Sequence, residues 1–259
     1  MEIEILFKIG VSLIAGIGAG LGTGFAGMSA SAVITPLLIG LLGVSPFTAM
    51  GVALASDVLA SAVSAYTFKR NKNIDLKNSW VMMVFVLIFT IVGSYIGSFT
   101  SPTFLGGYSI LVTLFMGIKF LVRPIKESKK PIKNQTQRAK LIKSIICGVG
   151  IGFICGFVGG GGGLTMLFVL TVIMGYELKK AIGTSVFIMT FTALTGALSH
   201  FSLGEDPDIL VLGFCIIFTL IFSLVGAKIA NHVSTKTLNR VVGVILLFIT
   251  ALLFIAKII

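Results

Sequence analysis

Long apolar runs separated by short polar connections dominate this chain. Most runs are long enough for a helix that crosses the roughly 30 Å hydrocarbon core of a bilayer. Two are short, since about 13 helical residues at 1.5 Å each reach only ~20 Å. The pattern predicts an all-α polytopic membrane protein. The ten expected segments are 5–23, 30–43, 47–68, 79–99, 104–122, 142–156, 163–175, 181–201, 209–229 and 239–257.

Each short segment follows a glycine-rich stretch, at 24–31 in the first half of the chain and at 156–165 in the second. Glycine within an apolar run frees the backbone and allows close approach. In lipid, freed backbone persists only where it is buried in protein or lines a polar cavity. We therefore expect short broken or re-entrant helices here, with the two stretches forming the walls of one binding site.

The two halves of the chain match each other at a constant offset (148 − 16 = 132). Residues 92–93 later match 225–226, so one residue has been inserted between. We interpret the chain as a duplicated unit of five segments, with a first repeat at 1–122, a basic cytoplasmic linker at 123–141 and a second repeat at 142–259. The aligned glycines are Gly16, Gly18, Gly20, Gly24, Gly27, Gly43 and Gly51 with Gly148, Gly150, Gly152, Gly156, Gly159, Gly175 and Gly183.

Charge distribution predicts how the repeats are oriented. The connections at 69–77, 123–141, 176–180 and 230–238 carry lysine or arginine, whereas 203–208 is acidic. With ten segments, or with re-entrant hairpins, every basic connection falls on one side, as the positive-inside rule requires. Inverted repeats follow, with the basic loops in the cytoplasm and both termini outside. Broken helices between inverted repeats are typical of secondary transporters.

Composition supports the membrane assignment and excludes other classes. The chain is 56% hydrophobic and 11% charged, far below the charge of about 25% in soluble domains. The net charge of +11 resides in short loops, so it indicates membrane orientation and lipid contact rather than nucleic-acid binding. Cys147, Cys155 and Cys215 have no metal-ligand spacing, and we expect no metal or cofactor.

The candidate ligand contacts are the glycine-rich stretches and the hydroxyls near them. Two helix N-termini that converge at mid-membrane offer unpaired amides and positive dipole ends, which favour an anion. The alternative is close helix packing through small residues. The predicted substrate-binding residues are Gly27, Ser29, Ser31, Thr35, Gly159, Gly160, Gly161, Gly162, Gly163, Thr165, Thr184 and Ser185.

Asp57 is the carboxylate that lies deep in an apolar segment. Burying an acid in a membrane is costly, so such a residue is a functional candidate. We predict a role in ion coupling, with a protonated or serine-paired carboxyl that packs helices as the alternative. The repeat counterpart is Met189, so the duplication itself does not require an acid.

An enzyme is not expected from this chain. Catalysis needs clustered acids, histidines or a nucleophile with its base, and His200 and His232 lie far apart in sequence. A channel that uses the same glycine-lined tips remains an alternative to a transporter.

The second glycine-rich stretch and the residues around it resemble a known family. Residues 148–152, 156–163 and 181–185, the last reading Ala-Ile-Gly-Thr-Ser, are similar to the TauE/SafE sulfite exporter family of the toluenesulfonate uptake permease superfamily. The resemblance covers essentially the whole chain. The first copy departs from the pattern, because Met28 and Ser29 replace glycines and Val52 and Ala53 replace the Thr-Ser pair.

The resemblance implies a multi-pass plasma-membrane transporter of sulfur-containing anions such as sulfite or sulfonates. We therefore expect a secondary transporter that works by alternating access and is coupled to protons or another ion. The alternatives are an anion channel and a transporter of a non-sulfur organic anion. The expected partners are a small anionic substrate and membrane lipid, and a homo-oligomer is left open.

Overall fold

The computed structural model describes residues 2–122, 137–159, 162–230 and 232–258, and within these ranges it contains helices and short connections without a strand. Seven helices in these ranges are long and apolar enough to cross a membrane, which confirms an all-α polytopic fold. The helices are α1 Glu2–Ala26, α2 Ser31–Leu42, α3 Pro46–Arg70, α4 Leu76–Ser98, α5 Pro102–Val122, α6 Gln137–Val158, α7 Gly162–Phe168, α8 Leu178–Leu203, α9 Ile209–Ala230 and α10 Thr235–Ile258.

Every predicted segment corresponds to an element of the structure. The second is α2, with 12 residues. The seventh is α7, with seven residues, continued by a π-helical turn at Val169–Ile173. Both are too short to cross a bilayer alone, because a helix needs about 20 residues to do so.

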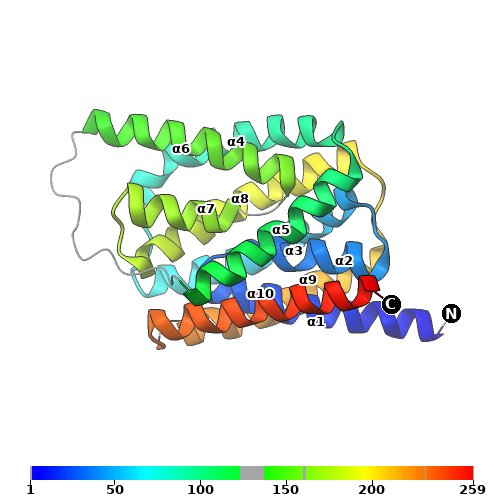
Figure 1. Ribbon diagram of the computed structural model, residues 1–259. Helices are drawn as coiled ribbons and strands as arrows, with labels where there is room; N and C mark the ends of the chain where they lie inside the picture. The colour runs from blue at the N-terminus through cyan, green and yellow to red at the C-terminus, as the bar shows by residue number, and fades with distance from the viewer. Residues whose placement is uncertain (1, 123–136, 160–161, 231, 259) are drawn as a thin grey trace.

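Each short helix forms a hairpin with the long helix before it. In Figure 1, α2 ends at the end of the molecule where α1 begins, and α7 ends at the end where α6 begins. The turns need left-handed backbone, which glycine adopts without a steric penalty. Gly27 and Gly159 have φ of 62° and 61°, and Gly43 and Gly175, which follow the short helices, have 65° and 72°.

The long helix of each hairpin packs on a helix from the other half of the chain. α1 lies against α9, and α6 lies against α4. Glycines spaced four residues apart make this approach close, as in small-xxx-small packing of membrane helices. A Cβ added at Gly20 would lie 2.6 Å from the Thr219 carbonyl oxygen, and one at Gly148 would lie 2.8 Å from the Met82 carbonyl oxygen.

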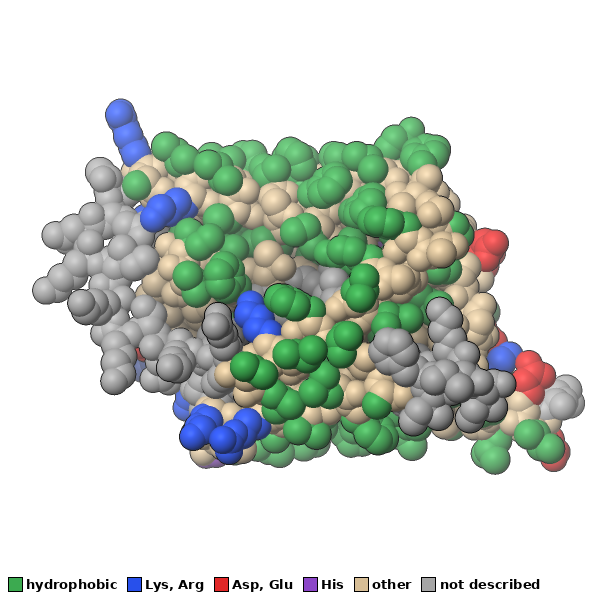
Figure 2. All heavy atoms as spheres, viewed as in Figure 1, with side chains coloured by type: hydrophobic (Ala, Val, Ile, Leu, Met, Phe, Trp, Pro, Cys, Tyr) green, Lys and Arg blue, Asp and Glu red, His purple; other side chains and the backbone are tan. Residues whose placement is uncertain are grey.

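The outer surface has the polarity expected of a bilayer-spanning protein. Figure 2 shows hydrophobic side chains along the length of the molecule, with Lys and Arg mainly toward one end and Asp and Glu at the other. Large apolar side chains such as Leu111 and Phe115 are more than 60% exposed. We call the two ends the basic end and the acidic end. Both termini lie at the acidic end (Figure 1).

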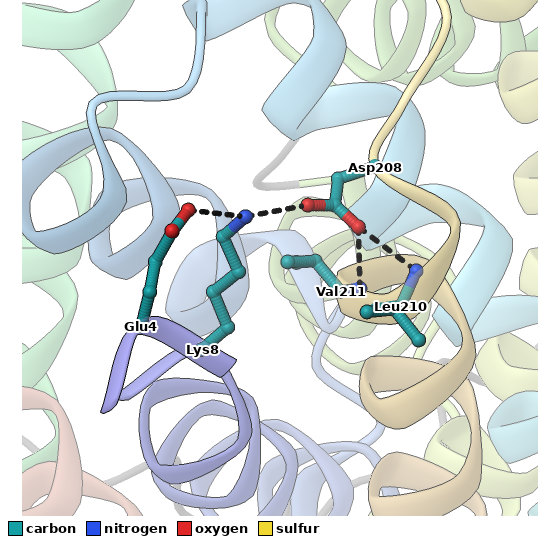
Figure 3. Close-up of polar contacts among 5 residues, drawn as sticks. All are labelled: Glu4, Lys8, Asp208, Leu210 and Val211. Atoms are coloured by element: carbon teal, nitrogen blue, oxygen red, sulfur yellow. Dashed lines mark hydrogen bonds and ion pairs between the residues drawn. The ribbon is translucent and has the colours of Figure 1, made fainter. Parts of the chain in front are cut away.

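An ion-pair cluster joins α1 to α9 at the acidic end (Figure 3). Lys8 Nζ lies 3.0 Å from both Glu4 Oε1 and Asp208 Oδ2. Asp208 Oδ1 accepts the amide of Leu210 at 2.9 Å and so caps α9. The hydrogen bond from Lys8 and those from the amides of Val211 and Leu210 lower the pKa of Asp208. This depressed pKa stabilises the fold at pH values above the pKa that the carboxyl has in the unfolded chain. The stabilisation is lost as the pH falls through the lower pKa of the folded state.

We expect Gly152→Ala to destabilise the fold by about 1–3 kcal/mol, the usual cost of overpacking. An added methyl group would overlap the Val86 carbonyl oxygen on α4. The measurement is the thermal unfolding midpoint in detergent. Gly150→Ala is the matched control, because nothing lies within 4 Å of a Cβ there. Equal midpoints for the two variants would contradict close packing of α4 on α6.

Candidate functional site

The tips of the two hairpins meet inside the molecule. A Cβ added at Gly163 would lie 2.6 Å from both the Gly27 carbonyl oxygen and the Ser29 amide nitrogen. It would also lie 2.7 Å from the sulfur of Met189 on α8. Two stretches more than 130 residues apart in sequence therefore contact each other through backbone, which only glycine at 163 permits.

The N-terminus of α2 brings a pair of hydroxyls to this contact. Ser29 Oγ and Ser31 Oγ lie 2.8 Å apart, and both side chains are buried. Ala30 is the N-cap residue and supplies no side-chain hydrogen bond. The amides of the first turn are paired locally, since the Ala32 amide donates to the Ser29 carbonyl at 3.2 Å and the Val33 amide to that of Ala30 at 3.0 Å. The positive end of the helix dipole remains, so this buried tip presents partial positive charge.

Asp57 lies beside this helix start and is completely buried. Thr23 Oγ1 on α1 donates to Asp57 Oδ1 at 3.2 Å, and the Ser29 side chain and Ala30 amide lie close to the same carboxyl. Asp57 Oδ2 has no hydrogen-bond partner among the described residues. The carboxyl is therefore held by the first hairpin and keeps one oxygen available.

The second half of the chain places sulfur where the first half places oxygen. Cys155 occupies the position that corresponds to Thr23, and Met189 the position that corresponds to Asp57. A Cβ at Gly162 would overlap Cys155 Sγ, just as one at Gly163 would press on the Met189 sulfur. The acid and its hydroxyl partner are thus confined to one side of the contact.

Ser185 and Thr184 are neighbours in sequence, but their side chains contact different parts of the structure. A Cβ at Gly27 would lie 2.6 Å from Ser185 Oγ, so Ser185 borders the first tip. Its hydroxyl donates to the Ile182 carbonyl at 2.8 Å. Thr184 Oγ1 instead accepts the Asp75 amide at 3.0 Å, which anchors the connection between α3 and α4 at the basic end.

The other predicted ligand residues are dispersed around the tips. Gly159 forms the second turn, where a Cβ would lie 2.5 Å from that of Met50. Thr35 is buried one turn further along α2, and its hydroxyl has no partner within the described ranges. Thr165 is half-buried on α7. Gly160 and Gly161 lie outside the described residues.

His200 is a buried contact residue that sequence reasoning set aside. Its Nδ1 lies 3.2 Å from the Phe47 carbonyl oxygen, and its Nε2 lies 3.0 Å from that of Gly156. The ring also contacts the Phe47 ring, with centroids 4.1 Å apart. His200 therefore links α8 to α3 and to the second hairpin near its tip. The repeat counterpart is Phe68, and this asymmetry was the available sequence signal.

Asp75 holds the basic end together. Tyr176 Oη donates to Asp75 Oδ2 at 3.1 Å, and Lys180 Nζ lies 3.8 Å from the same oxygen. Burial and the Asp75 charge raise the pKa of Tyr176, so this phenol stays a proton donor at physiological pH.

The fold and the buried polar groups together define a class of protein. The molecule is a polytopic helical membrane protein with a buried polar site between two helical hairpins. Within the described ranges, no three His, Cys, Asp or Glu side chains gather as a metal site. A helix start, hydroxyls and one carboxyl are suited to binding a small polar solute rather than to covalent chemistry.

The comparisons identify the family. Residues 12–253 match the family described as "Sulfite exporter TauE/SafE", and the chain belongs to this family of membrane transporters. It is 25% identical to a probable membrane transporter protein of Bacillus subtilis, YunE, over 92% of this chain and 94% of that protein. It is 27% identical to another probable membrane transporter protein, MJ0441 of Methanocaldococcus jannaschii, over 96% of this chain and 97% of that protein. The protein is accordingly a transporter and not an enzyme.

We predict that Gly163→Ala abolishes transport while the protein still inserts and folds. The added methyl group forces the two hairpin tips apart. Flux in proteoliposomes is the measurement, with the elution profile in detergent as the check on folding. Gly213→Ala on α9 is the control, because a Cβ there meets nothing within 4 Å. Normal flux through the Gly163 variant would place the tips away from the transport pathway.

Proposed function

We propose that this protein is a secondary transporter of a small sulfur-containing oxyanion, such as sulfite or a sulfonate, and that it works by alternating access. The observation that carries the proposal is the contact between the two hairpin tips beside buried polar groups. The TauE/SafE membership supports the sulfur chemistry, because the matching family is described as a sulfite exporter.

The chemistry of the first tip favours an anion as the substrate. The start of α2 presents the positive end of the helix dipole, and Ser29 and Ser31 add hydroxyls within one turn. Such a helix start stabilises negative charge without a salt bridge. Broken helices that direct their N-termini at an anionic group are a known arrangement in secondary transporters.

Asp57 is the residue that couples transport of the anion to a second ion. An anion and an ionised carboxylate repel each other strongly at a buried site, because the low dielectric screens little. The anion and a proton on Asp57 therefore favour each other's binding. This linkage is reciprocal, so a proton gradient can drive the anion. Another cation at the unpartnered Asp57 Oδ2 would supply the same coupling.

Inverted repeats provide the basis for alternating access. In Figure 1 the hairpin of α1 and α2 starts from the acidic end, whereas that of α6 and α7 starts from the basic end. Equivalent helices have equivalent partners, since α1 with α9 corresponds to α6 with α4. We propose that rocking between such related units exposes the site to each side in turn.

The orientation we propose follows the charges at the two ends. The basic end faces the cytoplasm by the positive-inside rule, and both termini face outside the plasma membrane. The repeats would then be 1–122 and 142–259, joined on the cytoplasmic side by 123–141, of which 123–136 lies outside the described residues.

The test is transport by purified protein in proteoliposomes. Labelled sulfite, thiosulfate, taurine and a carboxylate control are compared with and without an imposed pH gradient. Saturable transport of one sulfur anion, enhanced by the gradient, is the expected result. Flux that never saturates would indicate a channel, and transport of the carboxylate alone would indicate a non-sulfur organic anion.

We expect Asp57→Asn to abolish proton-driven accumulation without loss of expression, because the amide cannot exchange a proton at this site. The measurement is substrate accumulation as a function of the imposed pH gradient. Asp206→Asn serves as control, since that acid is exposed in the connection between α8 and α9 at the acidic end. A variant with unchanged flux and unchanged pH dependence would remove Asp57 from the mechanism.

The orientation predicts opposite labelling of two introduced cysteines. Asn71→Cys and Asp206→Cys are made separately in a background without Cys147, Cys155 and Cys215. A membrane-impermeant thiol reagent applied to intact cells should label position 206, whereas position 71 should react only after the cells are opened. Labelling of both positions from one side would refute the inverted repeat.

A further inference from the structure

A pocket opens at the basic end of the molecule, separate from the hairpin tips. Its volume is about 450 Å³, within the usual range of roughly 300–1,000 Å³ for small-molecule sites. The end of α3, the start of α8 and the end of α9 converge on it. It is lined by Thr67, Asn71, Asn73, Lys179, Lys228 and His232.

The lining has the chemistry of an oxyanion site. Two ammonium groups, from Lys179 and Lys228, are accompanied by amide and hydroxyl side chains, and no carboxylate is among these lining residues. At this end Asp75 accepts a hydrogen bond from Tyr176 and lies 3.8 Å from Lys180, and Glu177 is exposed at the start of α8. Charge-assisted hydrogen bonds from lysine to an oxyanion are about twice as strong as those between neutral groups.

The fold itself does not require these basic residues. At the corresponding positions of the other repeat, Lys179, Lys228 and His232 are replaced by Phe47, Tyr95 and Phe99 (179 − 47 = 132; 228 − 95 = 133; 232 − 99 = 133). Two of those aromatic residues, Tyr95 and Phe99, pack on each other with ring centroids 5.1 Å apart. Equivalent helices are therefore built without charge at these positions.

Membrane orientation accounts for a positive charge at each of these helix ends, but not for the convergence of two lysines on one pocket. The positive-inside rule requires lysine and arginine near the ends of spans, and exposed Lys69 and Arg70 at the end of α3 already meet that requirement. Lys179 at the start of α8 and Lys228 in the last turn of α9 lie at helix ends too, but they differ from Lys69 and Arg70 because both line one pocket. Lys179 also lies near the first hairpin tip along α8, because the six residues from Lys179 to Ser185 correspond to ~9 Å of helical rise.

We propose that this pocket binds a small oxyanion of the sulfate or phosphate type, with Lys179 and Lys228 as its principal ligands. The oxyanion comes either from solution at the basic end or from the phosphate of an anionic lipid. Binding at this pocket does not depend on which species the protein transports.

The test is the thermal unfolding midpoint of the purified protein in detergent, titrated with sodium sulfate against sodium chloride at equal ionic strength. A ligand that binds the folded state raises stability by RT ln(1 + [L]/Kd). Sulfate also stabilises proteins by exclusion from their surfaces, so the informative quantity is the difference between wild type and variant. Lys228→Gln and Lys179→Gln should each lose the sulfate-specific part of the rise.

Two control variants make the result specific. Lys69→Gln removes an exposed charge from the same end without altering the pocket lining, and it should keep the full rise. Lys228→Arg keeps a cationic donor and should retain most of it. Sulfate-dependent rises equal to wild type in both Lys→Gln variants would overturn the proposal.

A second arm separates the two sources of oxyanion. The proteins are reconstituted in nanodiscs of zwitterionic lipid with or without phosphatidylglycerol. A wild-type midpoint that rises with phosphatidylglycerol and no longer responds to sulfate, with both effects absent in Lys228→Gln, assigns the pocket to lipid phosphate. A sulfate response that persists in either lipid assigns it to a soluble anion. The absence of both responses in wild type would refute the site.

Discussion

Backbone that leaves a helix inside a membrane has to be covered by protein, and the rest of this structure depends on that constraint. Each hairpin breaks at a left-handed glycine, Gly27 or Gly159. The exposed turn of one hairpin is then covered partly by the other, through the contact of Gly163 with Gly27 and Ser29. The two hairpins are therefore physically linked, because each broken helix helps to cover the other.

Close helix packing places the tips where they can meet. Rows of glycine on α1 and α6 bring these helices against α9 and α4, each from the opposite half of the chain. Small residues are effective here because association in lipid relies on close van der Waals contact rather than on hydrophobic burial. Each hairpin is thus fixed along its length by the other repeat, which leaves its tip in a defined position.

Several buried or pocket-lining polar residues have apolar counterparts in the other half of the chain. Asp57 corresponds to Met189, His200 to Phe68, and Lys179 to Phe47. The matching positions in the other half of the chain are filled by apolar residues. The polar members lie beside the first tip, next to the second hairpin and at the basic end, which makes two similar halves chemically different.

The sequence alone determined the helical membrane class, the ten segments and the glycine breaks, because hydrophobic length and glycine spacing are local properties of the chain. It could not show that Thr184 anchors the Asp75 connection while Ser185 borders Gly27, since adjacent residues of a helix point in different directions. The hydrogen bonds of His200 and the pocket between Lys179 and Lys228 were likewise invisible. Those features join residues far apart in sequence, and only the tertiary packing of the helices decided them.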